Sequence, residues 1–347
     1  MRDDRLSQFF LAILGVVALG FVLKVAKGVI LPLVVAWLLY FIFAPVVRVM
    51  AKRKIPTFIS TTVVLMVFIG VCFGGALFLN GRVQALIEAF PRYQARFAEL
   101  LIEYSQSYNL PKYVVSNIDP GPMIGKYLLS LSTFFVGFVS NLILVVIFLV
   151  FLLSSAPYFE RKIEMAFSKK HSRKVIHLLH TISLQIGRYL ALQFMISAIT
   201  GVLVWLALKS IGVDFSITWG ALAFVLNFIP TIGSIVASVP PVVLSFVQFH
   251  PQMAPVVITA LALFGIQQVM GNLIAPKIMG ENLNLSPIVI LLSLLFWGWL
   301  WGVTGAILSI PIASAIKIIC ENVEQLKFIG VLMGSSRYMG KRPDSRL

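Results

Sequence analysis

Amide and hydroxyl side chains stand beside helix-breaking residues in the apolar last third of this chain. Asn227 lies three residues before Pro230, and Thr231, Gly233 and Ser234 follow closely. Proline frees the carbonyl four residues earlier, and glycine lets another backbone approach. The amide and hydroxyls supply donors and acceptors that suit a polyhydroxylated ligand or a dehydrated cation. The pattern therefore predicts a binding site for a small polar solute or cation; the alternative is a proline kink satisfied locally, with no ligand.

A second polar group follows on a later apolar segment. Gln268 and Asn272 are four residues apart and share one helix face, next to Gln267. Buried amides can simply hold helices together, but the proline at position 276 favours a role in lining a site. Lys277 and Glu281 form a close charge pair that we place at an interface or a cavity mouth. The predicted substrate path comprises Asn227, Pro230, Thr231, Gly233, Ser234, Gln267, Gln268, Asn272, Pro276, Lys277 and Glu281.

The chemistry of these segments depends on their surroundings. In hydrocarbon, an unpaired backbone N–H or C=O costs several kcal/mol. Broken helices therefore persist at membrane depth only where protein or water satisfies them, and such places are commonly transport sites. Helix breaks are expected at Asn227–Gly233, at Pro240–Pro241 and at Asn272–Lys277.

Composition assigns the chain to the membrane proteins. Its mean hydropathy is +0.96, with 59% hydrophobic and only 12% charged residues, outside the range of soluble globular domains. The predicted fold is an all-α polytopic membrane protein with about eight transmembrane helices and an extracytoplasmic helical insertion. Two Pro/Gly-broken or re-entrant segments are expected within it. Spans are predicted near 8–23, 29–47, 57–80, 133–154, 189–209, 215–230, 253–272 and 302–320, with apolar pieces 231–249 and 285–301 left over.

The net charge of +15 is explained by membrane topology. Basic residues cluster at the N-terminus, after the second and fourth predicted spans, and from Lys317 to the C-terminus. This is the positive-inside pattern, so both termini are expected in the cytoplasm and the chain in a bacterial or archaeal inner membrane. The same clusters attract anionic lipid headgroups, and a nucleic-acid partner is not needed.

The predicted organisation has six parts. Residues 81–132 are polar but carry apolar positions at helical spacing, so an extracytoplasmic amphipathic subdomain is expected there, broken at Pro91, Pro111, Pro120 and Pro122. The parts are spans 1–3 (1–80), this subdomain (81–132), the fourth span (133–154), basic amphipathic cytoplasmic helices (155–188), a C-terminal transport unit with broken helices (189–320) and a cytoplasmic tail (321–347).

The sequence contains none of the usual enzyme motifs. It has no Gly-x-Ser-x-Gly elbow, no P-loop and no His-Glu-x-x-His. The chain is therefore expected not to be an enzyme and to need no cofactor or metal. Without a P-loop, active transport would draw on a sodium or proton gradient or on a partner.

At these residues the chain resembles the autoinducer-2 exporter family, the PerM-like permeases. The resemblance covers nearly the whole chain, from a hairpin ending Phe43-Ala-Pro45 through the basic segment to the C-terminal signature. That signature comprises Asn227-x-x-Pro230-x-x-Gly233, Pro240, Asn272, Pro276, Gly280, Leu285-x-Pro287, Gly302-x-x-Gly305 and Pro311.

The resemblance implies an inner-membrane transporter of about eight helices, assembled as a homo-oligomer. It also implies export of autoinducer-2, a small furanone-derived polyol used in quorum sensing. Alternating access through the helix breaks near Pro230 and Pro276 would then move the solute. The alternatives are a sodium/proton antiporter of the same family, with Glu281, Asp214 and Lys277 as candidate charges, and a non-transport membrane scaffold.

Overall fold

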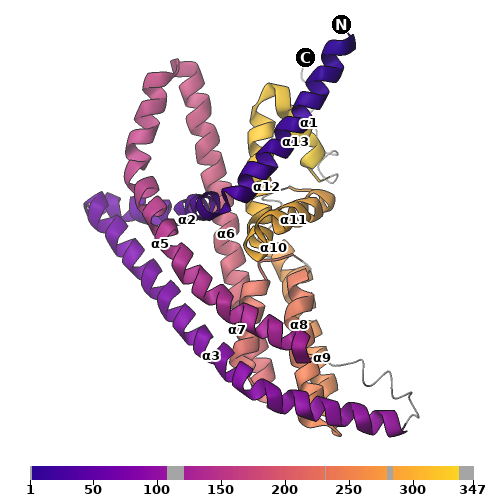
Figure 1. Cartoon of the computed structure of the whole chain (residues 1–347). Coiled ribbons are helices and arrows are strands. Elements are labelled where there is room, and N and C mark those ends of the chain that lie inside the picture. The colour runs from indigo at the N-terminus through magenta and orange to yellow at the C-terminus, as the bar shows by residue number, and fades with distance from the viewer. Residues whose placement is uncertain (1, 108–120, 231, 280–283, 336–347) are drawn as a thin grey trace. The chain divides into compact units, whose positions relative to one another are not determined.

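The computed structural model describes residues 2–107, 121–230, 232–279 and 284–335 (Figure 1). Those residues are almost entirely helical and form no strand, which confirms the all-α membrane fold. The helices before the last third are α1 (Arg2–Val25), α2 (Lys27–Lys52), α3 (Thr57–Ser107), α5 (Gly121–Ala166) and α6 (Lys169–Ile211). They are followed by α7 (Ser216–Leu226), α8 (Ile232–Phe249), α9 (Met253–Gln267), the π-helix η1 (Gln268–Ile274) and α10 (Ala275–Met279). The chain closes with α11 (Pro287–Trp301), α12 (Val303–Asn322), the 3-10 turn η2 (Glu324–Leu326) and α13 (Lys327–Met333).

Several prolines lie inside continuous helices. Pro240 and Pro241 are within α8, and Pro91 is within α3. The predicted breaks at these positions are therefore wrong. A proline removes one backbone donor, but in an apolar helix the neighbouring groups can satisfy the carbonyls that it frees.

The expected break at Pro276 also takes another form. The helix continues through this region as η1 and then α10, so the chain is wound more widely rather than interrupted. Pro276 is the second residue of α10, directly after the π-helix, and it lacks the N–H that would continue the helical hydrogen bonding. Short π-helical turns are frequent at functional sites.

The chain forms two compact units, to each of which α3, α5 and α6 contribute residues. The first comprises the described residues of Met1–Leu65, Leu142–Ala191 and Glu281–Leu347, and the second those of Met66–Asn141 and Leu192–Gly280. The sixfold division of the chain predicted from the sequence stays a prediction.

Each unit has its own apolar core. In the first unit, one cluster joins α2, α6, α11 and α12 around Phe41, Ile186 and Trp301, and another joins α2, α3 and α5 around Leu149. In the second unit, α6, α7, α8 and α9 pack around Leu208 and neighbouring residues. Burial of these side chains fixes the helices that carry the polar residues discussed below.

In the first unit, α11 and α12 form a tight hairpin. Gly302 joins them with φ 68° and ψ −146°, a conformation that is essentially restricted to glycine. The Ser293 hydroxyl donates to the Ser309 carbonyl across the hairpin at 2.9 Å. A Cβ on Gly305 would lie 1.9 Å from the Trp297 carbonyl oxygen, so only glycine permits this approach.

We expect Gly302→Ala to destabilise the α11–α12 hairpin by about 1–3 kcal/mol, because alanine is strained at this φ and ψ. Nothing lies within 4 Å of the added Cβ, so the cost comes from the backbone alone. Thermal unfolding of the purified protein measures the change. Gly298→Ala is the matched control, because its Cβ meets Ala306 at an ordinary 3.8 Å. Equal unfolding temperatures for the two variants would contradict the prediction.

In the part of the chain that the structure describes, six helices are long and apolar enough to cross a membrane. They comprise Lys27–Lys52, Thr57–Gln106, Lys169–Ile211, Ile232–Phe249, Met253–Ile278 and Val303–Asn322. Within the described residues, shorter apolar stretches accompany them: Asn141–Ser155, which is part of the longer α5, Ser216–Leu226 and Pro287–Trp301. Because some of these helices are arms of hairpins, the count of eight crossings stays a prediction.

Candidate functional site

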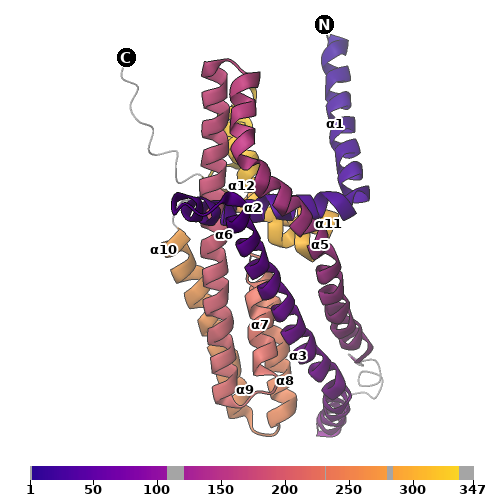
Figure 2. The same ribbon diagram turned by 90° about the vertical axis from the view of Figure 1, so that its left-hand side faces the viewer.

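In the second unit, α7 and α8 form a helical hairpin. The Gln248 side chain, near the end of α8, donates to the Gly212 carbonyl at 2.8 Å and accepts from the Asp214 amide at 3.0 Å. These bonds place the end of α8 beside the start of α7, so the hairpin tip lies between Leu226 and Ile232. Figure 2 shows α7 and α8 side by side, next to α6.

The first arm of this hairpin is too short to cross a bilayer. With 11 residues, α7 spans about 16 Å at 1.5 Å per residue, against about 30 Å of hydrocarbon. The second arm, α8, has 18 residues and spans about 27 Å, so the short α7 reaches only part of the way along it. The predicted helix break around Pro230 is confirmed, because α7 ends at Leu226 and α8 begins at Ile232. The predicted span 215–230 and the leftover piece 231–249 are the two arms of this one hairpin.

Side chains of α6 satisfy the polar groups of the tip. Gln193 donates from its Nε2 to the Asn227 carbonyl at 2.7 Å. Asn227 donates from its Nδ2 to the Ser197 hydroxyl at 3.0 Å. Ser197 is fully buried, whereas Gln193 and Asn227 are half-buried. A carbonyl at the end of a helix thus has a donor, as a backbone inside a membrane requires.

Two glycines bring α6 and α7 into backbone contact next to this cluster. A Cβ on Gly201 would lie 2.8 Å from the Gly220 carbonyl oxygen, and one on Gly220 would lie 2.7 Å from the Gly201 oxygen. Small residues at such crossings let membrane helices pack closely. Gln193, Ser197 and Gly201 are spaced four residues apart, so they lie on one face of α6, the face that contacts α7 and the tip.

Close packing also fixes the tip itself. A Cβ on Gly233 would lie 1.8 Å from the Leu226 carbonyl oxygen, which is far shorter than any real contact. Glycine is therefore required where the chain re-enters α8. Ser234 is half-buried one residue further, and its carbonyl accepts from the Ser238 hydroxyl at 2.8 Å.

The groups left at the tip are mainly hydrogen-bond acceptors. The amide nitrogens of Gln193 and Asn227 are used in the bonds above. Among the described residues, nothing donates to Gln193 Oε1 or Asn227 Oδ1. The cluster carries no charged side chain. A neutral ligand with hydroxyl donors matches these oxygens better than an anion does.

Of the predicted path residues, the structure groups Asn227, Pro230 and Gly233 at the tip, with Ser234 at the start of α8. Thr231 lies outside the described residues. The local kink considered as an alternative is partly present, since Gln193 and Ser197 satisfy the tip. These hydrogen bonds come from another helix, however, and they leave the side-chain oxygens of Gln193 and Asn227 without a donor among the described residues.

The second predicted group forms its own pair. Asn272 donates to the Gln268 carbonyl oxygen at 2.6 Å on η1, and both side chains are exposed. Gln267 is half-buried at the end of α9, while Pro276 and Lys277 are exposed on α10. Glu281 lies outside the described residues, so its pairing with Lys277 stays a prediction.

Three polar residues that the structure places in buried contacts were not among the residues predicted from the sequence. Gln193 and Ser197 are polar residues four apart in an apolar helix, beside Gly201, and this spacing could have signalled them. Lys317 was grouped with the solvated cytoplasmic basic residues, but it is only 4% exposed within α12.

Comparisons with known proteins support a transport function. A family model described as AI-2E family transporter matches residues 9–325. A candidate transport protein of Borreliella burgdorferi is 34% identical, over 96% of this chain and 92% of its own length. A candidate transport protein of Haemophilus influenzae is 30% identical, over 95% of this chain and 97% of its own. The AI-2 transport protein TqsA of Escherichia coli is 29% identical, over 90% of this chain and 91% of its own.

Proposed function

Because this chain belongs to the AI-2E transporter family, we propose that the tip of its α7–α8 hairpin binds a small uncharged polar solute during transport. Family membership and the six long apolar helices identify a bacterial multi-pass membrane transporter. The finer proposal concerns the solute, its site and its direction.

One observation carries the proposal: the backbone is broken between two apolar helices, α7 and α8, and side chains of α6 form hydrogen bonds with the broken segment. We place this break within the bilayer, where hydrocarbon would not tolerate polar backbone groups that lack partners. The Gln193–Asn227–Ser197 cluster meets that requirement and still offers free oxygens. A purely structural helix would gain nothing from this arrangement.

The free oxygens favour a hydroxylated, uncharged solute. Asp214 is the one acidic residue between positions 192 and 280, and its carboxylate accepts from the Tyr93 hydroxyl at the hairpin base. A proton relay through the tip would therefore lack a carboxylate. Autoinducer-2 is a small polyol of the required class, and TqsA carries the name AI-2 transport protein. We propose that the protein exports autoinducer-2 across the inner membrane and that both of its termini lie on the cytoplasmic side.

We further propose that the hairpin moves along α6 at the Gly201–Gly220 contact during alternating access. Because neither glycine has a side chain, the two backbones meet directly here, between Trp205 and Phe224. The exposed Gln268–Asn272 pair belongs to the same path in this proposal. Amides within the candidate span Met253–Ile278 need polar surroundings, which a solute path provides.

Transport in proteoliposomes tests the proposal. We expect Asn227→Ala to lower autoinducer-2 flux at least about tenfold, because a lost hydrogen bond in a dry site costs about 1–3 kcal/mol. Asn80→Ala, which removes a half-buried asparagine from α3, is the matched control. The protein amount in the vesicles is measured for each variant.

Full flux in Asn227→Ala at equal protein amount would remove the tip from the solute path. If the wild-type chain exchanged sodium for protons and moved no autoinducer-2, sodium/proton antiport would replace autoinducer-2 export as the proposed function.

A further inference from the structure

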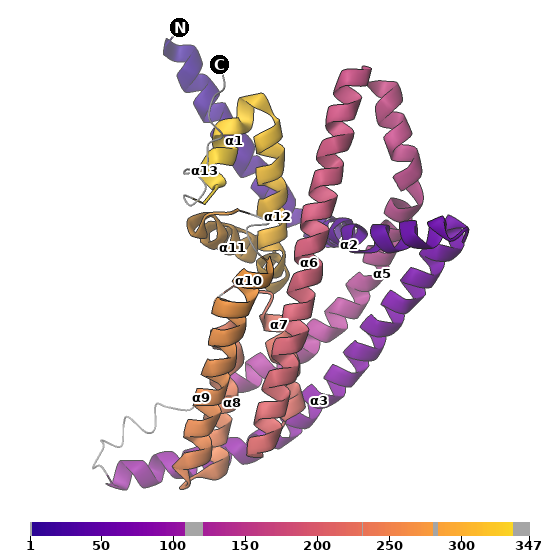
Figure 3. The same cartoon turned by 180° about the vertical axis from the view of Figure 1, so that it is seen from behind.

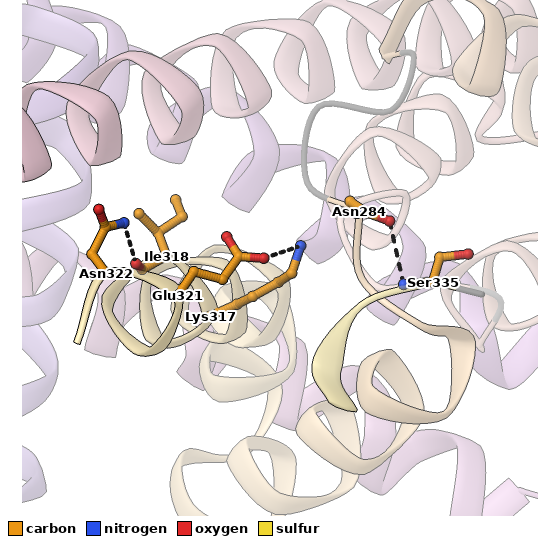
Figure 4. A network of polar contacts seen from close by, with 6 residues as sticks. All are labelled: Asn284, Lys317, Ile318, Glu321, Asn322 and Ser335. Atoms are coloured by element: carbon orange, nitrogen blue, oxygen red, sulfur yellow. Dashed lines mark hydrogen bonds and ion pairs between the residues drawn. The ribbon is translucent and has the colours of Figure 1, made fainter. Parts of the chain in front are cut away.

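A buried charge in the first unit has no role in the hairpin site. Lys317 is 4% exposed within the candidate span Val303–Asn322. Its ammonium pairs with the Glu321 carboxylate, one turn further along α12, at 3.3 Å (Figure 4). Ionisable residues inside membrane helices are costly and commonly mark functional sites.

An unsatisfied hydroxyl lies one turn before this lysine. Ser314 is 1% exposed, and among the described residues its Oγ has no hydrogen-bond partner. Positions 314, 317 and 321 are three and four residues apart, so they share one face of α12. Buried hydroxyls are normally satisfied, and an exception calls for an explanation such as an absent ligand.

The helix α13 covers the outer end of this face, and Figure 3 shows α12 turning into it. A Cβ on Gly330 would lie 2.7 Å from Glu321 Cγ, so α13 rests directly on that side chain. The segment after α13 is fastened to the start of α11. The Ser286 amide donates to the Met333 carbonyl at 2.9 Å, and the Ser335 amide donates to the Asn284 carbonyl at 3.2 Å. Among the described residues, one further bond, from the Ser335 amide to Asn284 Oδ1 at 3.3 Å, completes this fastening.

We propose that Ser314, Lys317 and Glu321 form a second binding site for the neutral hydroxylated solute, on the side of the membrane that carries the chain termini, beneath α13. The inference rests on the proposed function, since it assigns a loading position to the same solute. The ammonium donates, the carboxylate accepts and the hydroxyl does either, which suits a polyol. The ion pair is neutral as a whole, so it gives an anion no net attraction.

Cysteine accessibility tests the site without knowledge of the solute. In the full chain with Cys72 and Cys320 replaced by alanine, Ser314→Cys is treated with a membrane-impermeant methanethiosulfonate reagent from the side of the termini. Ser309→Cys is the matched control, because Ser309 is equally buried on α12 but its hydroxyl donates to the Ala306 carbonyl at 2.7 Å. We expect labelling at 314 to be at least about tenfold faster, since a binding site beneath this cover must open to water for solute to enter. Equal rates would overturn the proposal.

Protection against this labelling identifies the ligand class. Autoinducer-2 is expected to slow labelling of Ser314→Cys, and Glu321→Gln should raise the half-protecting concentration about tenfold, because a charged acceptor is lost. Inorganic phosphate is expected to give no protection. Protection by phosphate that strengthens in Glu321→Gln would overturn the neutral-solute assignment.

The two proposals fail in different ways. Wild-type flux of autoinducer-2 without protection at position 314 would overturn the second site and leave the hairpin site standing. Absence of that flux would instead count against the proposed substrate, while the relative labelling of 314 and 309 would still decide whether the second site exists.

Discussion

Gly233→Ala is expected to lower the apparent unfolding temperature by roughly 5–10 °C and to abolish transport. The added Cβ would lie 1.8 Å from the Leu226 carbonyl oxygen and 2.7 Å from its carbon, both backbone atoms. A flexible side chain could give way, but this backbone can do so only by opening the hairpin tip. The fluorescence-monitored melting of the purified protein and flux in proteoliposomes are the two measurements.

Gly265→Ala is the control for this substitution. Gly265 lies in α9, with nothing within 4 Å of its added Cβ, so alanine should be neutral or slightly stabilising there. If the Gly233→Ala and Gly265→Ala proteins had the same unfolding temperature and the same flux, the requirement for glycine at the hairpin tip would be contradicted.

Gln193→Met is expected to reduce flux at least about tenfold and to destabilise the chain by about 1–3 kcal/mol. Methionine has a similar length but no donor, so the Asn227 carbonyl loses its 2.7 Å partner inside the apolar region. Gln252→Met, at the exposed start of α9, controls for the chemistry of the change.

A double-mutant cycle separates a coupled cluster from two independent losses. Gln193 and Asn227 share the tip, so Gln193→Met combined with Asn227→Ala should cost less than the sum of the single changes. Additive losses in flux would mean that the two side chains act separately and would contradict the tip cluster as one site.

The sequence was sufficient for the class of protein and for the location of the hairpin tip. Hydropathy is a local property of composition, so the apolar helices followed from residue content alone. The break at Pro230 was also readable, because proline and glycine restrict the backbone at their own positions. The same local rule failed at Pro240, Pro241 and Pro91, where continuous helices absorb the proline.

What the sequence could not decide were contacts between residues far apart in the chain. That α7 and α8 pair as a hairpin depends on Gln248 meeting Gly212 and Asp214, and the tip depends on Gln193, which is 34 residues from Asn227. Likewise, Lys317 looks solvated by its charge and its place near the C-terminus, yet packing buries it. Local residue chemistry determined that this chain enters the membrane and breaks its helices there. Only tertiary packing decided which groups satisfy the break, because hydrogen bonds and burial depend on neighbours that adjacent residues do not specify.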